Sequence, residues 1–245
     1  MVFRKGDSVR FDLGKFERVW EQEAGSDISR LHVKLILPTR TGAWVTQSEL
    51  LGRRTFHLCI DMQQMYDRDT EWHAPWMRAV LPAVTEIAEA LSDRTVFTRY
   101  LPPQRPEVAV GAWRTYYDRW KSMTRERLPP EMLDLVPSLS RLVPPARILD
   151  KLVYSQWSNP ALHRFFADSA IDTLVITGGE TDVCVLAAVL GAIDLGYRIV
   201  LPTDALFGSA DETHDAVLRL YRSRFGQQLV ACSTQDVLDE WRKAP

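Results

Sequence analysis

The sequence predicts an α/β protein in which a parallel β-sheet carries helices on both faces. From Phe56 onward, short apolar stretches rich in β-branched residues alternate with longer segments whose apolar residues recur every three or four positions. Strands and helices that alternate in this way form parallel sheets, because each helix returns the chain to the start of the next strand. With 245 residues, 46% apolar and 25% charged, the chain has the composition of an ordinary globular protein.

The segment that precedes this pattern lacks sustained periodicity. We interpret residues 1–54 as an N-terminal extension ahead of a domain that spans residues 55–245. The first elements expected in the domain are a strand over Phe56–Met62, a helix over Leu81–Asp93 and a strand over Thr95–Tyr100. Pro82 is expected in the first turn of that helix, where a missing N–H has little effect.

Residues 101–145 interrupt the alternation with a Pro-, Arg- and Trp-rich insertion, in which we expect one helix around Thr115–Met123. Strands then follow at residues 147–151, 173–178, 197–202 and 228–233, and helices at 159–169, 182–196, within 209–226 and at 234–244. The helix around Cys184 is apolar almost all round and carries small residues. We therefore expect it to pack against the sheet and against a partner subunit of a homo-oligomer, a dimer or tetramer.

Charge and cysteine content narrow the function classes. A formal net charge of -2 gives no electrostatic reason to expect a nucleic-acid or membrane partner. No apolar run approaches the roughly 20 residues that span a bilayer, and the first residues do not resemble a secretory signal. The three cysteines, Cys59, Cys184 and Cys232, have no paired spacing, which is typical of a reducing compartment. We expect a cytoplasmic protein that acts on a small molecule.

Reactive side chains follow several of the predicted strands. In an open parallel sheet, ligands bind beyond the carboxyl ends of the strands. The residues at these ends are Asp61, Arg99, Lys151, Cys184 and Asp204. Each has an ordinary structural interpretation when it is taken alone, since a strand-end acid often caps a helix and a buried cysteine is usually part of the core.

An acid, a lysine and a cysteine at three such ends form a chemically coherent set. A thiolate is a nucleophile, and a helix N-terminus or a neighbouring cation lowers the pKa of a thiol. A nearby carboxylate can take the thiol proton and return it to a leaving amine. This combination of Asp61, Lys151 and Cys184 predicts nucleophilic catalysis.

Three segments, "LCIDMQ", "DKLVYSQW" and "TGGETDVCVLAAVLGAIDLGYRIVLPTDA", resemble the isochorismatase-like cysteine hydrolases in order and spacing. That family includes nicotinamidases and N-carbamoylsarcosine amidohydrolases. The resemblance covers the chain from about Phe56 to the C-terminus and leaves out the extension and the insertion.

The resemblance implies a three-layer Rossmann-like fold with a six-stranded parallel sheet and helices on both faces. It implies that Asp61, Lys151 and Cys184 form a catalytic triad. It also implies a non-proline cis peptide between Gly179 and Glu180, and an oxyanion hole to which Gly179, Glu180 and Cys184 contribute.

The sequence departs from the nicotinamidases after the second strand. Those enzymes carry a histidine-containing metal cluster there, whereas this chain reads "TRYLPPQRPEV" and has no histidine. We therefore expect no metal and no cofactor. His57 lies inside a strand and His214 inside a helix, so both are interpreted as structural, and Cys59 and Cys232 are assigned to the core.

The leading hypothesis is a metal-independent hydrolase of small amide or carbamoyl C–N bonds. Residues expected to face the substrate are Gln63, Tyr66, Arg99, Tyr100, Trp113 and Trp157. Arg99 suits a substrate carboxylate, and a structural ion pair is an equally good interpretation of it. The alternatives are a vinyl-ether hydrolase of the isochorismatase type and a non-catalytic α/β binding module.

Overall fold

A computed structural model of the protein describes residues 10–12, 17–19, 37–38, 44–45 and 51–244. The N-terminal extension expected over residues 1–54 therefore falls largely outside the described residues. Four short strands are described there: β1 (Arg10–Asp12), β2 (Glu17–Val19), β3 (Leu37–Pro38) and β4 (Trp44–Val45). They form two antiparallel pairs, β1 with β2 and β3 with β4.

The main sheet confirms the predicted parallel architecture. Its strands run in the order β11-β9-β8-β5-β6-β7, and every neighbouring pair is parallel. The bounds are β5 (Thr55–Ile60), β6 (Thr95–Tyr100), β7 (Arg147–Lys151), β8 (Thr173–Gly179), β9 (Arg198–Pro202) and β11 (Leu229–Cys232). A further strand, β10 (Leu206–Phe207), pairs with the end of β8. It was missed because two residues are too few to show a period.

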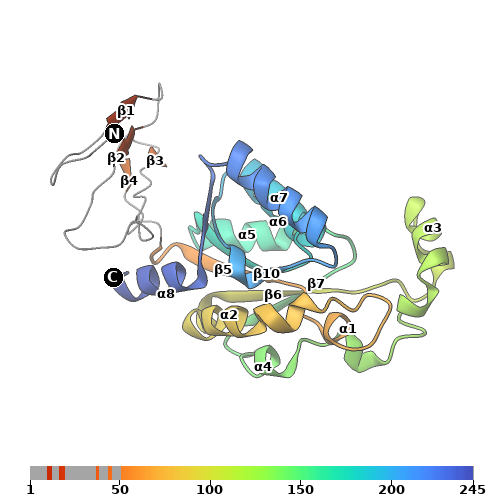
Figure 1. The fold of residues 1–245 in the computed structure, drawn as a ribbon. Coiled ribbons are helices and arrows are strands. Elements are labelled where there is room, and N and C mark those ends of the chain that lie inside the picture. The colour runs from red at the N-terminus through yellow and green to blue at the C-terminus, as the bar shows by residue number, and fades with distance from the viewer. Residues whose placement is uncertain (1–9, 13–16, 20–36, 39–43, 46–50, 245) are drawn as a thin grey trace.

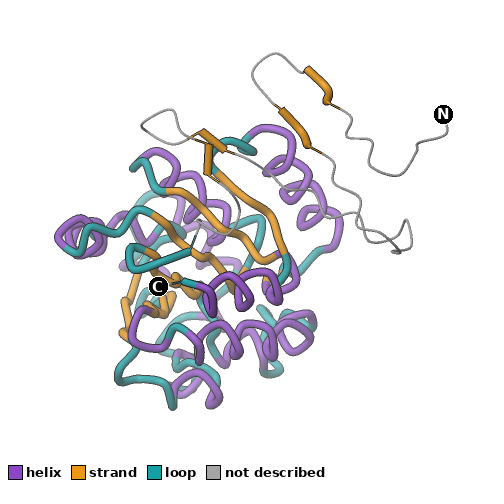
Figure 2. The backbone as a smooth tube through the Cα atoms, turned by 90° about the vertical axis from the view of Figure 1, so that its left-hand side faces the viewer, coloured by secondary structure: helices purple, strands orange, loops and turns teal. Residues whose placement is uncertain are grey.

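Helices cover both faces of this sheet, so the predicted three layers are present (Figures 1 and 2). The bounds are α1 (Gln64–Asp67), α2 (Trp76–Ala90), α3 (Ala112–Arg119), α4 (Pro137–Ser140), α5 (Pro160–Asp168), α6 (Cys184–Asp194), α7 (Asp211–Arg224) and α8 (Thr234–Lys243). In Figure 1, α2 and α8 lie below the sheet and α5, α6 and α7 above it. Each of the two helix layers packs against the sheet around its own apolar cluster.

The start of α2 corrects one prediction. The helix begins at Trp76, so Pro82 lies in its interior and not in its first turn. The buried residues Met77 and Val80 extend the apolar stripe of the helix toward the N-terminus. Pro82 is tolerated because it lies on the exposed side, where water can reach the carbonyl that loses its partner.

The two glycines at the end of β8 are required by close packing. Gly178 has φ +98°, and a Cβ there would lie 2.1 Å from the carbonyl oxygen of Ile60 on β5. A Cβ on Gly179 would lie 2.4 Å from the ring of Phe207 on β10. Only glycine allows β8 to pass this close to both neighbours, and this approach sets the turn that leads to α6.

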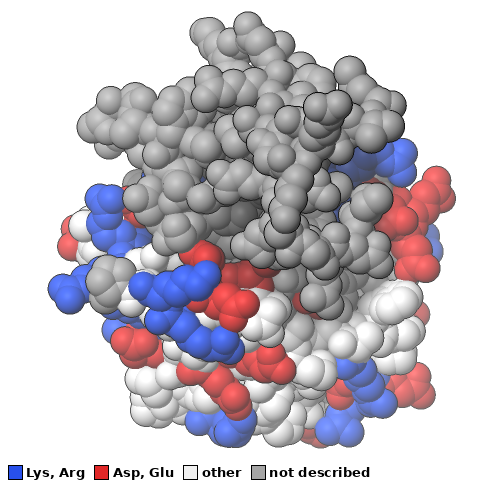
Figure 3. All heavy atoms as spheres, turned by 60° about the vertical axis from the view of Figure 1, so that its left-hand side comes forward, with Lys and Arg blue, Asp and Glu red and all other residues white. Residues whose placement is uncertain are grey.

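On the face drawn in Figure 3, basic and acidic side chains of the described residues are interspersed. Within the described part of the chain, no helix is both long and apolar enough to cross a membrane.

The packing at β8 predicts that Gly178→Ala is strongly destabilising. Gly196 also has a positive φ, +85°, but a Cβ there would meet nothing within 4 Å. Gly196→Ala should cost about 1 kcal/mol from the left-handed backbone alone. Gly178→Ala adds the clash with Ile60 and should cost more than about 3 kcal/mol. Denaturant unfolding of both variants measures the difference, and equal losses would contradict the packing argument.

Candidate active site

Three residues from separate strands and a helix meet beyond the carboxyl edge of the sheet. Asp61 follows β5, Lys151 ends β7, and Cys184 begins α6 directly after the turn that leaves β8. The Lys151 Nζ lies 2.7 Å from Asp61 Oδ2 and 3.3 Å from Cys184 Sγ. All three residues are buried, with 0%, 2% and 5% exposure for Asp61, Lys151 and Cys184. The structure therefore brings together the three side chains that the sequence singled out.

Lys151 reaches this position from a strand that is not adjacent to β5. Strand β6 separates β5 from β7, and Tyr100 of β6 pairs with Lys151 in the sheet register. The lysine side chain passes over the Tyr100 ring, with its Nζ 5.2 Å from the ring centroid. Its third acceptor is the carbonyl of Val153 at 3.4 Å. A long side chain is needed here, because it spans one whole strand.

Thr98 on β6 binds Asp61 twice. Its hydroxyl donates to Asp61 Oδ1 at 2.6 Å and accepts from the Asp61 backbone N–H at 3.2 Å. Thr98 was not among the residues predicted for the site. The available signal was a threonine in the middle of a buried strand, because a buried hydroxyl needs a partner.

The electrostatics of the thiol differ from the expectation that a cation and a helix N-terminus lower its pKa. Burial raises the pKa of Cys184, and the charge of Asp61 raises it further; Lys151 lowers it by less. Burial by itself lowers the pKa of Lys151, but Asp61 and Cys184 together outweigh burial and raise it. The resting site thus holds a protonated thiol beside a charged ammonium group.

The turn between β8 and α6 leads directly into Cys184. The Gly179–Glu180 peptide is cis, as the resemblance implies. The carbonyl of Glu180 accepts from the N–H groups of Val183 and Val185 at 3.1 and 3.0 Å. The N–H groups of Glu180 and Cys184 donate to no other group in the part of the chain that the structure describes. Free N–H groups at a helix start can stabilise a developing negative charge.

Gln63, expected to face the substrate, instead forms side-chain hydrogen bonds with backbone groups of the protein. Its Nε2 donates to the carbonyls of Tyr100 and Leu133 at 3.0 and 2.8 Å, and its Oε1 accepts from the Tyr100 N–H at 2.7 Å. The side chain is fully buried. Gln63 therefore ties the insertion to the ends of β5 and β6.

Arg99 forms the structural ion pair that was its alternative interpretation. Its Nε and Nη2 donate to the two carboxylate oxygens of Asp150 at 2.7 and 3.0 Å, and its Nη1 donates to Asp134 at 3.1 Å. This bidentate contact raises the pKa of Arg99. Three of its five N–H groups are therefore engaged by two carboxylates of the protein itself.

Trp157 packs under α6 and not beside the thiol. Its Nε1 donates to the Ala188 carbonyl at 2.9 Å, and its ring stacks on Tyr197 with 5.6 Å between centroids. Gly191 makes room for this ring, since a Cβ there would lie 2.2 Å from it. Its hydrogen bond and stacking support a structural role.

The other predicted contacts, Tyr66, Tyr100 and Trp113, belong to one group of packed rings. We call this group the aromatic cluster; it consists of Tyr66, Trp72, Tyr100, Trp113, Tyr116, Tyr117, Trp120 and Tyr154. The hydroxyls of Tyr100 and Tyr117 are hydrogen bonded. Burial raises the pKa values of Tyr66 and Tyr154, so both phenols stay neutral.

Comparison with known proteins identifies the family. A sequence model of the isochorismatase domain matches residues 55–233, well over half of the chain. The chain belongs to the isochorismatase family, and it is therefore a hydrolase. A stretch of 70 residues is 34% identical to the uncharacterized isochorismatase family protein YwoC of Bacillus subtilis, covering 29% of this chain and 35% of that protein. The match thus spans about a third of that relative's length.

Solved structures share the fold at low identity. A cysteine hydrolase from Pseudomonas syringae pv. phaseolicola aligns with a TM-score of 0.65 and 18% identity, over 77% of this chain and 92% of that one. A pyrazinamidase/nicotinamidase from Streptococcus mutans aligns with a TM-score of 0.59 and 21% identity, over 72% of this chain and 99% of that one.

The end of β6 does not fit the metal site implied for nicotinamidases in this family. Tyr100 stands there, followed by Leu101 and two prolines, and its hydroxyl is already bonded to Tyr117. Over the described residues, no group of three His, Cys, Asp or Glu side chains is arranged to hold a metal ion. We derive no metal-dependent step for this isochorismatase-family chain.

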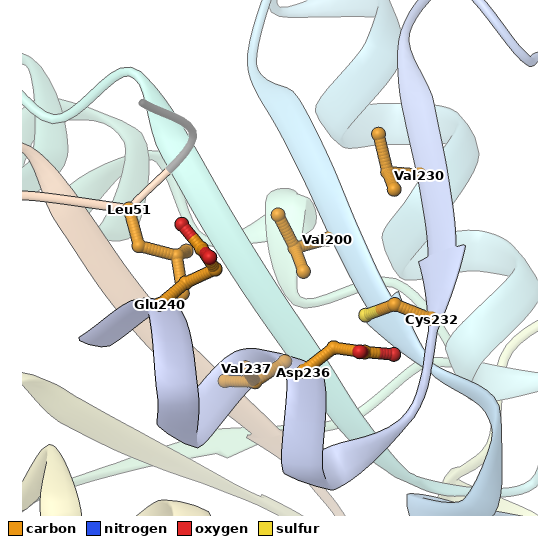
Figure 4. Close-up of a pocket in the computed structure, with 7 residues that line it drawn as sticks. All are labelled: Leu51, Val200, Val230, Cys232, Asp236, Val237 and Glu240. Carbon is orange, nitrogen blue, oxygen red and sulfur yellow. The ribbon is translucent and has the colours of Figure 1, made fainter. Parts of the chain in front are cut away.

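The remaining histidine and cysteine candidates have structural surroundings. His57 lies between the hydroxyls of Thr95 and Thr177 at 3.0 and 2.8 Å, and burial lowers its pKa to about 3. Burial raises the pKa values of Cys59 and Cys232 to about 12. Figure 4 shows that Cys232 lines a small hollow between α8 and the sheet, together with Leu51, Val200, Val230, Asp236, Val237 and Glu240. None of these residues belongs to the group around Cys184.

The electrostatics predict that Asp61→Asn makes the Cys184 thiol more reactive. Removing the carboxylate charge lowers the pKa of Cys184, since Asp61 raises it in the native site. The variant's thiol should react with iodoacetamide at pH 8 at least about tenfold faster, as a fall of one pKa unit gives for a mostly protonated thiol. Peptide mapping identifies the alkylated cysteine.

Asp204→Asn is the matched control for this experiment. Asp204 also follows a strand, but it binds the N–H and hydroxyl of Thr234 at 2.8 and 3.0 Å, away from the thiol. Its substitution should leave the alkylation rate of Cys184 unchanged. A slower or equal rate in Asp61→Asn would contradict the electrostatic account.

Proposed function

We propose that this hydrolase acts without a metal on a small, non-peptide amide or carbamoyl compound and cleaves its C–N bond through a thioester on Cys184. The observation that carries the proposal is the buried contact of Lys151 with both Asp61, at 2.7 Å, and Cys184, at 3.3 Å. A nucleophile, a base and a cation within contact of one another are the groups that acyl transfer requires.

In the first half of the reaction, Asp61 takes the proton of the Cys184 thiol as the sulfur attacks the carbonyl carbon. Because burial keeps the thiol protonated at rest, a base in contact is needed to form the nucleophile. The electron pair of the carbonyl moves onto its oxygen, which accepts hydrogen bonds from the N–H groups of Glu180 and Cys184. Lys151 remains an ammonium group and stabilises the thiolate.

In the second half, the tetrahedral intermediate collapses and the C–N bond breaks. The leaving nitrogen takes the proton from Asp61 and departs as ammonia or an amine. Water then attacks the thioester while Asp61 accepts one of its protons, and that proton returns to the sulfur as the carboxylic product leaves. Every proton is accounted for by water and the two side chains.

Two features support a small and largely uncharged substrate. Cys184 is only 5% exposed, so the approach to the sulfur is narrow. The nearby walls are supplied by the aromatic cluster, whose flat faces suit a planar amide. The names of the relatives agree in reaction class: one similar structure is a cysteine hydrolase and another a pyrazinamidase/nicotinamidase.

The proposal predicts an acyl adduct on Cys184 when a slowly hydrolysed amide is quenched during turnover. The substrate comes from a panel of small amides, carbamoyl compounds and isochorismate, scored by product release. Intact mass and peptide mapping locate the adduct. Cys184→Ser should lose at least about 1,000-fold in kcat/KM, because an alkoxide forms far less readily than a thiolate.

Cys59→Ser and Cys232→Ser are the matched controls. Both should keep most activity and lose some stability, because a hydroxyl replaces a buried thiol. An adduct on either of these cysteines, or a fully active Cys184→Ser, would contradict the proposal. Turnover of isochorismate alone, without an adduct, would favour the vinyl-ether hydrolase.

We also predict that chelators leave turnover unchanged. The end of β6 supplies a tyrosine, a leucine and two prolines, Tyr100 to Pro103, and none of these is a usual ligand of zinc or iron. The measurement is kcat/KM after dialysis against EDTA, with metal content measured in parallel. Stoichiometric metal that is lost together with activity would contradict the prediction.

A further inference from the structure

Thr98 is a fully buried residue on β6 whose one hydroxyl serves two parts of Asp61. We propose that Thr98 is a positioning residue that fixes which oxygen of Asp61 exchanges a proton with Cys184. This inference rests on the proposed function, since it assigns a role within that reaction. The inference follows from the contacts of three polar groups of Asp61, which are its backbone N–H, Oδ1 and Oδ2.

A hydroxyl has a single proton, and here the proton is committed. Thr98 donates it to Oδ1 at 2.6 Å, while the hydroxyl oxygen accepts the backbone N–H of Asp61 at 3.2 Å. The other carboxylate oxygen, Oδ2, contacts Lys151 at 2.7 Å. The two oxygens of Asp61 are thus made unequal: Oδ1 accepts the Thr98 proton, and Oδ2 faces the ammonium group that also contacts the Cys184 sulfur.

The backbone of Asp61 explains why such a clamp is needed. Asp61 has φ +50°, a left-handed conformation that a side-chain residue adopts less readily than glycine. The residue lies just beyond β5, where the ladder of the sheet no longer holds it. By binding the N–H and the carboxylate together, Thr98 holds both the backbone and the side-chain rotamer in one arrangement.

Other titratable groups face Asp61, and they remain in place when Thr98 is changed. Those whose pKa values feel the charge of Asp61 are Cys59 on β5, Tyr66 on α1, Lys151 on β7, Glu180 in the turn after β8, and Cys184 on α6. Thr98 carries no charge. Its substitution therefore tests the hydrogen bond and the orientation, with the local charges unchanged.

Thr95 provides a matched control on the same strand. It is also fully buried, and its hydroxyl also makes two contacts, with the Leu91 carbonyl at 2.8 Å and with His57 at 3.0 Å. Neither contact reaches Asp61. Thr95→Val and Thr98→Val therefore remove the same group from the same strand, and only Thr98→Val alters the site.

The experiment compares Thr98→Val, Thr98→Ser and Thr95→Val with the wild-type protein, with Thr98→Ala as a smaller substitute if the valine variant does not fold. Thr98→Val should lose roughly 10- to 100-fold in kcat with a much smaller change in KM, the loss expected for a hydrogen bond to a charged group. The acid limb of its kcat/KM profile should move up by about one pH unit, because a carboxylate without its donor is protonated more readily. Thr98→Ser should keep most of the wild-type kcat and should bring the acid limb of kcat/KM back toward its wild-type pH. Thr95→Val should lose stability and keep the wild-type pH profile of kcat/KM.

A second measurement does not depend on turnover. The carbon-13 signal of the Asp61 carboxyl carbon, assigned by its absence in Asp61→Asn, is followed against pH in each protein. A higher midpoint in Thr98→Val and an unchanged midpoint in Thr95→Val would support the inference. An unchanged midpoint in Thr98→Val, or the same kinetic loss in Thr95→Val, would overturn it. If the wild-type protein cleaves no amide and traps no acyl group, the proposed function fails, and the carboxyl titration still decides whether Thr98 acts on Asp61.

Discussion

The buried ion pair between Lys151 and Asp61 is the constraint on which the rest of the site depends. Both side chains have 0% exposure, and buried charges are tolerated only when they are paired and hydrogen bonded. Thr98 satisfies the second carboxylate oxygen, while Cys184 and Val153 accept from the ammonium group. Strands β5, β6 and β7 and helix α6 must therefore hold a single register, since a shift of any one would leave a buried charge without its partner.

This arrangement keeps Cys184, the proposed nucleophile, protonated at rest. Burial and the charge of Asp61 hold the Cys184 thiol protonated despite the neighbouring ammonium group. A protonated, enclosed thiol reacts slowly with oxidants and with unrelated electrophiles. In the proposed reaction, the carboxylate that raises the pKa of the thiol is also the base that accepts its proton, so the thiolate forms as the sulfur attacks the carbonyl.

The sequence predicts the sheet and the three central residues because both depend on patterns along the chain. Strand–helix alternation implies a parallel sheet, and the carboxyl ends of parallel strands lie at one edge. Contacts of individual side chains depend on neighbours in space and are harder to predict. Successive residues of a strand face opposite ways, so Thr98 and Tyr100 share one face and Arg99 points to the other, where Asp150 binds it. That alternation was available in the sequence, and it would have replaced Arg99 by Thr98 as the candidate.

The insertion over residues 101–145, which lies within the stretch matched by the family model, contributes directly to the surroundings of the thiol. Tyr117 binds the hydroxyl of Tyr100, and the Tyr100 ring lies against Lys151. Gln63 holds the backbone of Leu133 to the end of β6. Aromatic walls exclude water, and exclusion of water strengthens the interactions among the three central groups. In the proposed reaction the reacting groups belong to the sheet and α6, and the insertion adds aromatic rings beside them.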